Sequence, residues 1–276
     1  MKPFIRAIAF LLLLTIIDFL LRQGFIFQFL PILLPQQLTM LVVYGLFAAA
    51  AWFITKSFCK REAKELIDLG ISFNRQNRRD FYVGFLLGVG IWAIVSFIQA
   101  FMAGFSWELR AEISLFNVLY GLTFIFLADL GTELYTRGYP LTRIEDRFGS
   151  IWAIIIMTIF VGLKTFLFQS DSDLLLYVIL IPVLHTIFFS IIYFKTRRLG
   201  AAVGVHTGAN FITISIFDLR PGQSGQLIPS GIFQPDTSLE SLSVNALQLP
   251  WVFAAIAFSI LVYVWWAKEK LPEKQV

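Results

Sequence analysis

The composition of this chain of 276 residues excludes most classes of soluble protein. Hydrophobic residues make up 58% of it and charged residues only 14%, whereas soluble domains have about 45–50% and about 25%. An ordinary soluble enzyme and a disordered chain are excluded, and the single Cys59 cannot form an intramolecular disulfide. The net charge of +4 does not indicate nucleic acid, because the basic residues lie in short loops between apolar runs. We therefore expect an integral membrane protein that binds no nucleic acid.

Eight stretches are long and apolar enough to cross a bilayer, since a helix needs about 20 residues to span the hydrocarbon core. They lie near residues 4–21, 38–54, 81–103, 113–131, 151–168, 174–194, 199–216 and 248–266. The first has no small-residue cleavage site, so we expect an uncleaved helix with Asp18 near its end, within reach of the membrane surface. The sequence predicts an all-α, polytopic bundle of about eight transmembrane helices that forms one domain over residues 1–276.

Basic residues are distributed unevenly between the two sides that these spans define. The N-terminal residues, the second-to-third, fourth-to-fifth and sixth-to-seventh loops and the C-terminal tail hold most of the 22 Lys and Arg. The opposite side holds Arg22, Arg110 and Arg220. Because basic loops remain in the cytoplasm, both termini are predicted to be cytoplasmic. A bacterial-type inner (plasma) membrane fits this pattern, with an organelle membrane as the alternative.

Two connections are long enough to have structure of their own. Residues 62–79 are charged and partly amphipathic, which favours a cytoplasmic surface helix. Residues 218–247 are rich in Gly and Pro and indicate an irregular extracytoplasmic connection.

Ionisable residues at membrane depth are costly and usually face the interior of a bundle. Asp129, Glu133 and Arg137 follow one another at intervals of four and share one helical face, where Glu133 and Arg137 could form an ion pair. Lys164 lies well inside the fifth span, where we expect it to pair with Glu133 or Asp129. His185 stands alone in the sixth span and is predicted to be a core or hydrogen-bonded histidine.

The seventh span carries a second pair at an interval of four, His206 and Asn210. Gly200, Gly204 and Gly208 recur on the same helix and permit close contact with another helix. We predict that the fourth, fifth and seventh spans pack together, with their polar side chains facing one cavity. The alternative is a buried polar cluster that only sets the helix register.

At these residues the sequence resembles the CPBP family of intramembrane proteases, which includes type II CAAX prenyl endopeptidases, lysostaphin-resistance-like proteins and Abi bacteriocin-immunity proteins. Members carry Glu-Glu-x-x-x-Arg-Gly, Phe-x-x-x-His and His-x-x-x-Asn, each on a membrane helix. Here the motifs read Thr132-Glu133-Leu134-Tyr135-Thr136-Arg137-Gly138, Phe160-Val161-Gly162-Leu163-Lys164 and His206-Thr207-Gly208-Ala209-Asn210. The resemblance covers about residues 115–215. It implies catalytic roles for Glu133, Arg137, His206 and Asn210. We expect no cofactor and no metal.

Two positions depart from the family pattern. Thr132 stands where the family has the first Glu, and Lys164 stands where it has the His of the second motif. The resemblance implies that the first Glu, with that His, activates the water, while His206 and Asn210 stabilise the oxyanion. A Thr hydroxyl cannot serve as a general base near neutral pH, and a protonated Lys accepts no hydrogen bond.

Three interpretations follow from these residues. The favoured one is a catalytically impaired relative that binds or regulates a membrane client, with membrane lipid and a peptide or prenylated protein as partners. The second is an active intramembrane endopeptidase with a rewired centre of Glu133 or Asp129, Lys164 and His206, since buried lysines can serve as catalytic groups. The third is a small transporter whose buried charges line a path.

Overall fold

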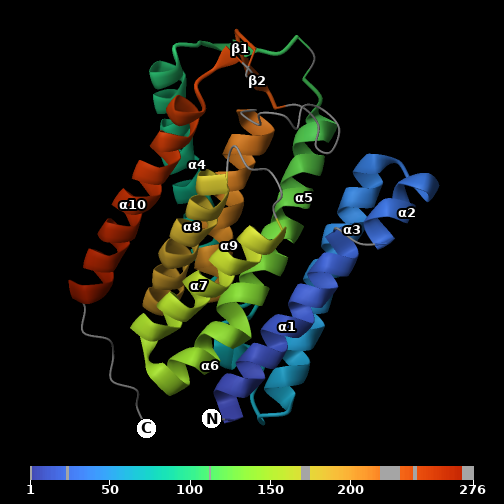
Figure 1. Ribbon diagram of the computed structural model, residues 1–276, viewed down its shortest axis with the longest axis vertical. Helices are drawn as coiled ribbons and strands as arrows, with labels where there is room; N and C mark the ends of the chain where they lie inside the picture. Colours follow the sequence, from blue (N-terminus) through green and yellow to red (C-terminus); the bar gives the residue numbers. More distant parts are fainter. Residues whose placement is uncertain are drawn as a thin grey trace.

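The computed structural model describes residues 2–22, 25–111, 113–168, 175–217, 231–238 and 241–268. In chain order the elements are α1 (Lys2–Arg22), α2 (Phe25–Leu33), α3 (Gln36–Lys60), the 3-10 turn η1 (Leu66–Leu69), α4 (Arg75–Ala103), β1 (Trp107–Leu109), α5 (Leu115–Glu133), the π-helical segment η2 (Leu134–Gly138), α6 (Tyr139–Phe148), α7 (Ser150–Phe168), α8 (Leu175–Thr196), α9 (Leu199–Asn210), the π-helical segment η3 (Phe211–Ile216), β2 (Phe233–Pro235) and α10 (Val244–Lys268). Figure 1 shows their arrangement.

Eight helical segments in the described residues are long and apolar enough to cross a membrane, which confirms the predicted bundle. They are Pro3–Leu21, Gln36–Lys60, Arg75–Ala103, Leu115–Phe148, Ser150–Leu167, Ile179–Thr196, Leu199–Ile216 and Asn245–Trp265. The fourth is longer than predicted, because α5 continues through η2 into α6. The cytoplasmic location of the termini stays a prediction.

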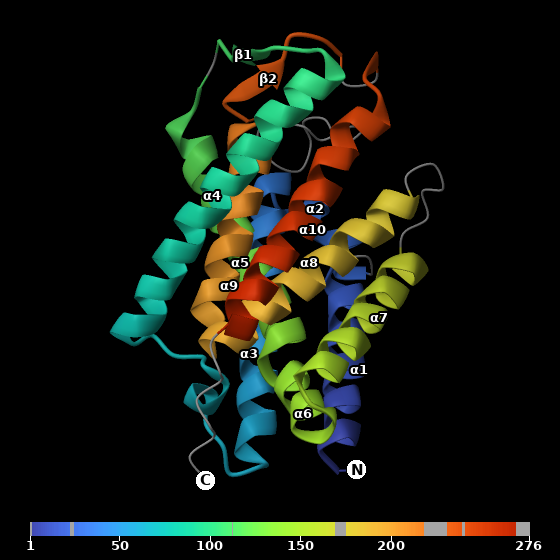
Figure 2. The same ribbon diagram turned by 90° about the vertical axis from the view of Figure 1, so that its left-hand side faces the viewer.

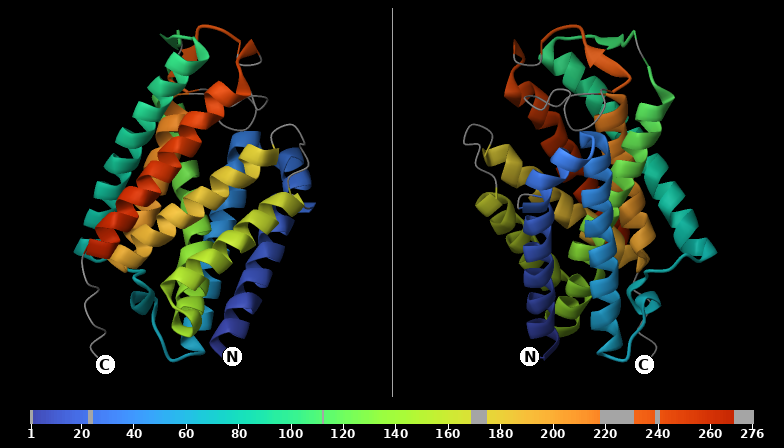
Figure 3. Two further views of the ribbon diagram at one scale, coloured as in Figure 1. Left: turned by 60° about the vertical axis from the view of Figure 1, so that its left-hand side comes forward. Right: turned by 90° about the vertical axis from the view of Figure 1, so that its right-hand side faces the viewer.

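The helices form two flanks around a central group. In Figure 1, α1, α2 and α3 lie on one flank, α4 and α10 lie on the other, and α5, α7, α8 and α9 lie between them. Figure 3 shows α7 and α8 side by side and slanted across the bundle. The strands β1 and β2 cover one end of the bundle, paired antiparallel with Trp107 opposite Pro235. Of the predicted irregular connection, residues 218–230, 239 and 240 lie outside the described residues.

The glycine repeat on α9 brings this helix into close contact with α4. A Cβ on Gly204 would lie 2.2 Å from the carbonyl oxygen of Phe81, and one on Gly208 would lie 2.1 Å from that of Phe85. No real Cβ is accommodated at such distances, so only glycine lets α9 approach α4 this closely. The predicted close contact is confirmed, and its partner is α4. Because α9 carries His206, this crossing sets the position of that side chain.

The largest hydrophobic cluster joins α1, α3, α6 and the η2 segment. Phe10, Phe47, Tyr135 and Tyr139 are all almost fully buried within it. Large apolar side chains are exposed elsewhere on the bundle, with Phe101 at 88%. Such exposure is expected where a helix faces lipid rather than water.

The surface helix predicted over residues 62–79 is wrong. Residues 62–74 form only the single turn η1, which ends at Gly70 with a φ of +67°, and residues 75–79 are the first turn of α4. A Cβ at Gly70 would lie 2.1 Å from the carbonyl oxygen of Arg197, so the turn packs directly on the α8–α9 connection. Leu69 and Ile71 are buried, which means that the amphipathic pattern marks a turn docked on the bundle.

Candidate functional site

The first part of the site lies where α5 widens into the π-helical segment η2. Arg137 Nη1 donates to Glu133 Oε1 at 3.1 Å and to Thr136 Oγ1 at 2.7 Å, and Arg137 Nη2 donates to the carbonyl oxygen of His185 at 3.2 Å. Both members of the expected Glu133–Arg137 ion pair are buried. Short π-helical segments are rare and occur often at functional sites. The segment thus anchors the guanidinium to both α5 and α8.

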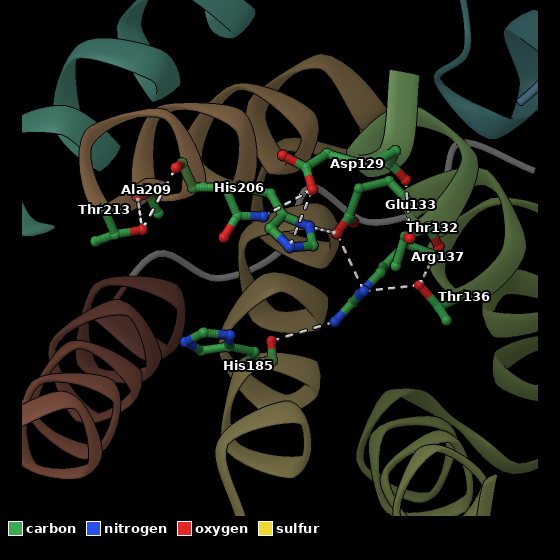
Figure 4. A network of polar contacts seen from close by, with 11 residues as sticks. Asp129, Thr132, Glu133, Thr136, Arg137, His185, His206, Ala209 and Thr213 are labelled. Atoms are coloured by element: carbon green, nitrogen blue, oxygen red, sulfur yellow. Dashed lines mark hydrogen bonds and ion pairs between the residues drawn. The ribbon is translucent and has the colours of Figure 1, made fainter. Parts of the chain in front are cut away.

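The second part comes from α9. His206 Nδ1 lies 2.8 Å from Glu133 Oε1, and its Nε2 lies 3.4 Å from Asp129 Oδ1. Asn210 Nδ2 donates to the same Asp129 oxygen at 2.8 Å. The imidazole ring stacks on Phe189 of α8, with 4.7 Å between ring centroids. Figure 4 shows Asp129, Glu133 and Arg137 turned toward His206. The sequence-predicted residues of α5 and α9 are therefore brought together.

Two carboxylate oxygens in this cluster are left over. Asp129 Oδ2 and Glu133 Oε2 are buried and have no hydrogen-bond partner among the described residues. A buried polar atom without a partner costs free energy unless water or a ligand satisfies it. The site therefore has the capacity to accept hydrogen bonds from a bound molecule.

A cavity of about 430 Å³ opens beside this cluster. Its polar wall carries Asp129, Thr132, Arg137, His206 and Asn210. Among the described lining residues, Asp129 is the one that has a carboxylate. The remaining wall is mostly apolar and comes from α3, α5, α7, α8 and η3; its side chains include Met40, Phe124, Val161, Pro182 and Ile214. The cavity thus combines a small polar centre with an apolar surround, as is typical of ligand sites.

Lys164 does not take part in this cluster. Its Nζ donates to Asp18 Oδ2 of α1 at 2.6 Å and lies 4.7 Å from the ring centroid of Tyr135. The Tyr135 hydroxyl in turn hydrogen-bonds with Thr15 of α1. A second intramembrane polar cluster therefore joins α1, η2 and α7.

Two predictions fail at this point. Lys164 was expected to pair with Glu133 or Asp129, and Asp18 was expected to reach the membrane surface. Asp18 is instead only 5% exposed and forms the ion pair with Lys164. The physical reason is that Glu133 already has Arg137 and His206 as partners, whereas Asp18 is a buried carboxylate that needs a cation.

His185 behaves as the predicted core histidine. Its ring packs between Trp92 and Trp251, with centroid distances of 5.8 and 5.9 Å, and against Phe189. Its contribution to the polar cluster is the backbone carbonyl that accepts from Arg137.

Sequence reasoning missed Asp18, Phe189 and Thr136 as neighbours of the functional residues. A signal for Asp18 was present: Asp18 and Lys164 lie about equally far along two spans that begin on the same side of the membrane. Opposite charges at equal depth are candidates for pairing. No comparable pattern marks Phe189, because Phe recurs throughout the apolar spans.

Among the described residues, no group of three or more His, Cys, Asp or Glu side chains is arranged so that it could hold a metal ion. In the cluster itself, the side chains of Arg137, His206 and Asn210 bond to one oxygen of each carboxylate, Glu133 Oε1 and Asp129 Oδ1.

The fold and the cluster define a polytopic membrane protein with a carboxylate–histidine–amide site inside its helical bundle. Residues 113–212, a little over a third of the chain, match the family model described as type II CAAX prenyl endopeptidase Rce1-like. Searches of curated proteins and of solved structures gave no match. The match covers the segment that carries the site and confirms the resemblance inferred from the three motifs.

Proposed function

We propose that this chain is a CAAX-protease-related membrane protein that holds a segment of a membrane client in its cavity without hydrolysing it at the rate typical of its family. One observation carries the proposal: both residues at the positions for water activation are bonded elsewhere. Thr132 Oγ1 donates to the carbonyl oxygen of Ala128 at 2.9 Å, and Lys164 is bonded to Asp18. Neither can remove a proton from a water molecule in the cavity.

The groups that remain are suited to binding. Arg137 offers charged donors and Asp129 a charged acceptor, and His206 and Asn210 add polar atoms on the same wall. Buried donors and acceptors in an apolar surround give strong, oriented hydrogen bonds because water does not compete. A peptide segment of a prenylated or membrane-anchored protein has the backbone groups to meet them and an apolar part for the remaining wall.

A second candidate is a hydrolase in which Asp129 replaces the missing glutamate. It is favoured by the place of Asp129 on the cavity wall, one turn before Thr132, with Oδ2 buried and unpartnered among the described residues. Asp129 would accept the proton of water, while His206 and Asn210 would stabilise the oxyanion. Against this, the Asn210 amide donates to Asp129 itself, and His206 lies between the two carboxylates, so neither is directed at a substrate carbonyl. The version with Lys164 as partner of the base loses its support because Lys164 pairs with Asp18.

A paired reversion tests the proposal. Thr132→Glu restores a carboxylate, and Lys164→His restores the second-motif histidine. Because Lys164→His removes the cation bonded to Asp18, all variants are made in both the native and the Asp18→Asn background. Purified proteins are assayed against a prenylated peptide and a membrane-anchored reporter. Asp129→Asn in the otherwise native chain is the matched control for the second candidate.

We expect no cleavage by the parent, none by either single variant and a gain when both changes are present, since base and partner act as a unit. Cleavage by the parent that Asp129→Asn abolishes would establish the second candidate and refute the proposal. A double variant that is folded and still binds the peptide, but cleaves it in neither background, would show that Thr132 and Lys164 do not account for the loss of hydrolysis.

A further inference from the structure

A second hollow lies on the opposite flank from α1 and is separate from the polar cavity. It has a volume of about 620 Å³ and lies between α4, α8, α9 and α10. Its walls are apolar and include Leu87, Ile91, Phe188, Phe258 and Val262. Figure 2 views the molecule from this flank, with α4 and α10 in front of α8 and α9. We call this hollow the α4–α10 groove.

One end of the α4–α10 groove is charged. Lys195 and Arg198 line it together with Asp80, so the charged lining residues described there sum to one positive charge. Arg198 forms an ion pair with Asp80. Lys195 Nζ donates to the backbone carbonyl oxygen of Trp265 at 3.2 Å, and it lies 4.6 Å from the centroid of the Trp265 ring. A tryptophan and a lysine together are typical of the depth at which lipid headgroups meet the hydrocarbon core.

The other end of the groove is closed. Gln99 Nε2 donates to the carbonyl oxygen of Leu247 at 2.5 Å, and Ala100 packs against Leu247, so α4 and α10 are in contact there. Figure 2 shows the two helices close together at the β-strand end and farther apart toward the other end. A transmembrane helix of a partner protein would have to pass this contact. A lipid acyl chain that enters the groove from one leaflet would not have to pass it.

The length of the groove fits one leaflet. Its lining on α4 runs from Asp80 to Ile91, and at 1.5 Å per residue this is about 16 Å. The hydrocarbon core of a bilayer is about 30 Å thick, so the groove spans about half of it. Its charged end is at the basic α8–α9 connection, so we expect this end at the headgroup depth of the leaflet next to the basic loops.

We propose that the α4–α10 groove binds one anionic phospholipid of that leaflet. The phosphate lies at Lys195 and Arg198, and an acyl chain lies along Leu87 and Phe258. The net positive charge selects an anionic headgroup over a zwitterionic one, and the apolar walls bind the chain whatever the headgroup. This site is independent of the client cavity, because it uses other side chains of α8 and α9.

The test is native mass spectrometry of the full chain in detergent, titrated with phosphatidylglycerol or with phosphatidylcholine of the same acyl chains. One basic side chain near an anionic headgroup corresponds to a preference of about fivefold. The parent should bind phosphatidylglycerol about fivefold more tightly. Lys195→Gln should remove this preference and keep chain binding, whereas Leu87→Trp, which fills the groove, should weaken binding of both lipids.

Matched controls distinguish the groove from the general lipid-facing surface. Leu86→Trp changes the adjacent exposed leucine of α4, which does not line the groove, and Lys56→Gln removes an exposed lysine of α3. Both should bind lipid as the parent does. Equal affinity of the parent for the two lipids, or equal losses in Leu86→Trp and Leu87→Trp, would overturn the proposal. A change of oligomeric state caused by Leu87→Trp alone would overturn it in favour of a protein partner in the groove.

Discussion

Replacing Lys164 by Met removes the cation of an ion pair that lies inside the membrane domain. The pair joins α1 to α7 at 2.6 Å, and its side chains are 21% (Lys164) and 7% (Asp18) exposed. Met has nearly the length of Lys and keeps the apolar stem in place. The perturbation is therefore mainly electrostatic: the Asp18 carboxylate stays buried while the ammonium is gone.

The size of the effect follows from that burial. Breaking a buried ion pair by removing one partner costs about 3–5 kcal/mol, because a charge is left in a medium of low dielectric constant. The partial exposure of Lys164 lets some water reach the pair, so we expect the lower end, about 3 kcal/mol. Replacing both Asp18 by Asn and Lys164 by Met removes both charges, and stability should be largely recovered.

The assay is reversible unfolding in mixed detergent micelles, applied to the parent, Asp18→Asn, Lys164→Met and the double variant. Residues in one ion pair show coupling free energies of about 0.5–3 kcal/mol, whereas independent sites add to within about 0.5 kcal/mol. We expect a coupling above 1 kcal/mol. Lys56→Met, at an exposed lysine of α3, is the matched control and should leave stability unchanged. Additive losses in the cycle would refute the reasoning.

Two further outcomes are expected. Gly208→Ala should lower the free energy of unfolding by about 1–3 kcal/mol, because its Cβ would lie 2.1 Å from the Phe85 carbonyl oxygen. The control is Gly90→Ala on α4, which has no described atom within 4 Å of the added Cβ and should leave stability unchanged. Equal losses of the two variants in thermal unfolding would contradict the close helix crossing. Burial raises the pKa of Glu62, but hydrogen bonds from Tyr139 and Arg6, together with the positive charges of Arg143 and Arg6, lower it, and the net pKa lies below its ordinary value. A depressed carboxyl pKa stabilises the fold above the unfolded-state pKa of about 4.3, and this contribution is lost as the pH falls through the folded-state value. Thermal unfolding between pH 7 and 3 should therefore show a shallower acid limb in Glu62→Gln, and an unchanged limb would contradict the assignment.

The fold followed from hydropathy because each span must satisfy its backbone internally and expose apolar side chains to lipid. This local requirement leaves a strong signal in the sequence for all eight spans. Half of the site followed as well, since Glu133 with Arg137, and His206 with Asn210, are pairs at an interval of four on single helices. Local periodicity places both members of such a pair on one face before any tertiary contact is known.

The contacts between helices could not be predicted in the same way. The Asp18–Lys164 pair depends on α1 lying next to α7, and no local pattern specifies which helices are neighbours. The pairing of Trp107 with Pro235 likewise joins residues far apart in the sequence. The two strands are also short, with three residues each. The helical spacing of the apolar residues before Gly70 predicts a helix, yet Leu69 and Ile71 are buried by contact with the bundle in a single turn.

The central claim is that the cavity holds a client segment without cleaving it. The most direct measurement incubates the unmodified protein with a fluorescent prenylated peptide, separates bound from free peptide, and determines the mass of the bound fraction over time. Arg137→Gln removes a charge that lines the cavity, so it tests whether the peptide is retained in the cavity. We predict saturable retention of peptide of intact mass that the variant weakens. Release of fragments by the unmodified protein at a rate that Asp129→Asn abolishes, or retention that Arg137→Gln leaves unchanged, would contradict the account.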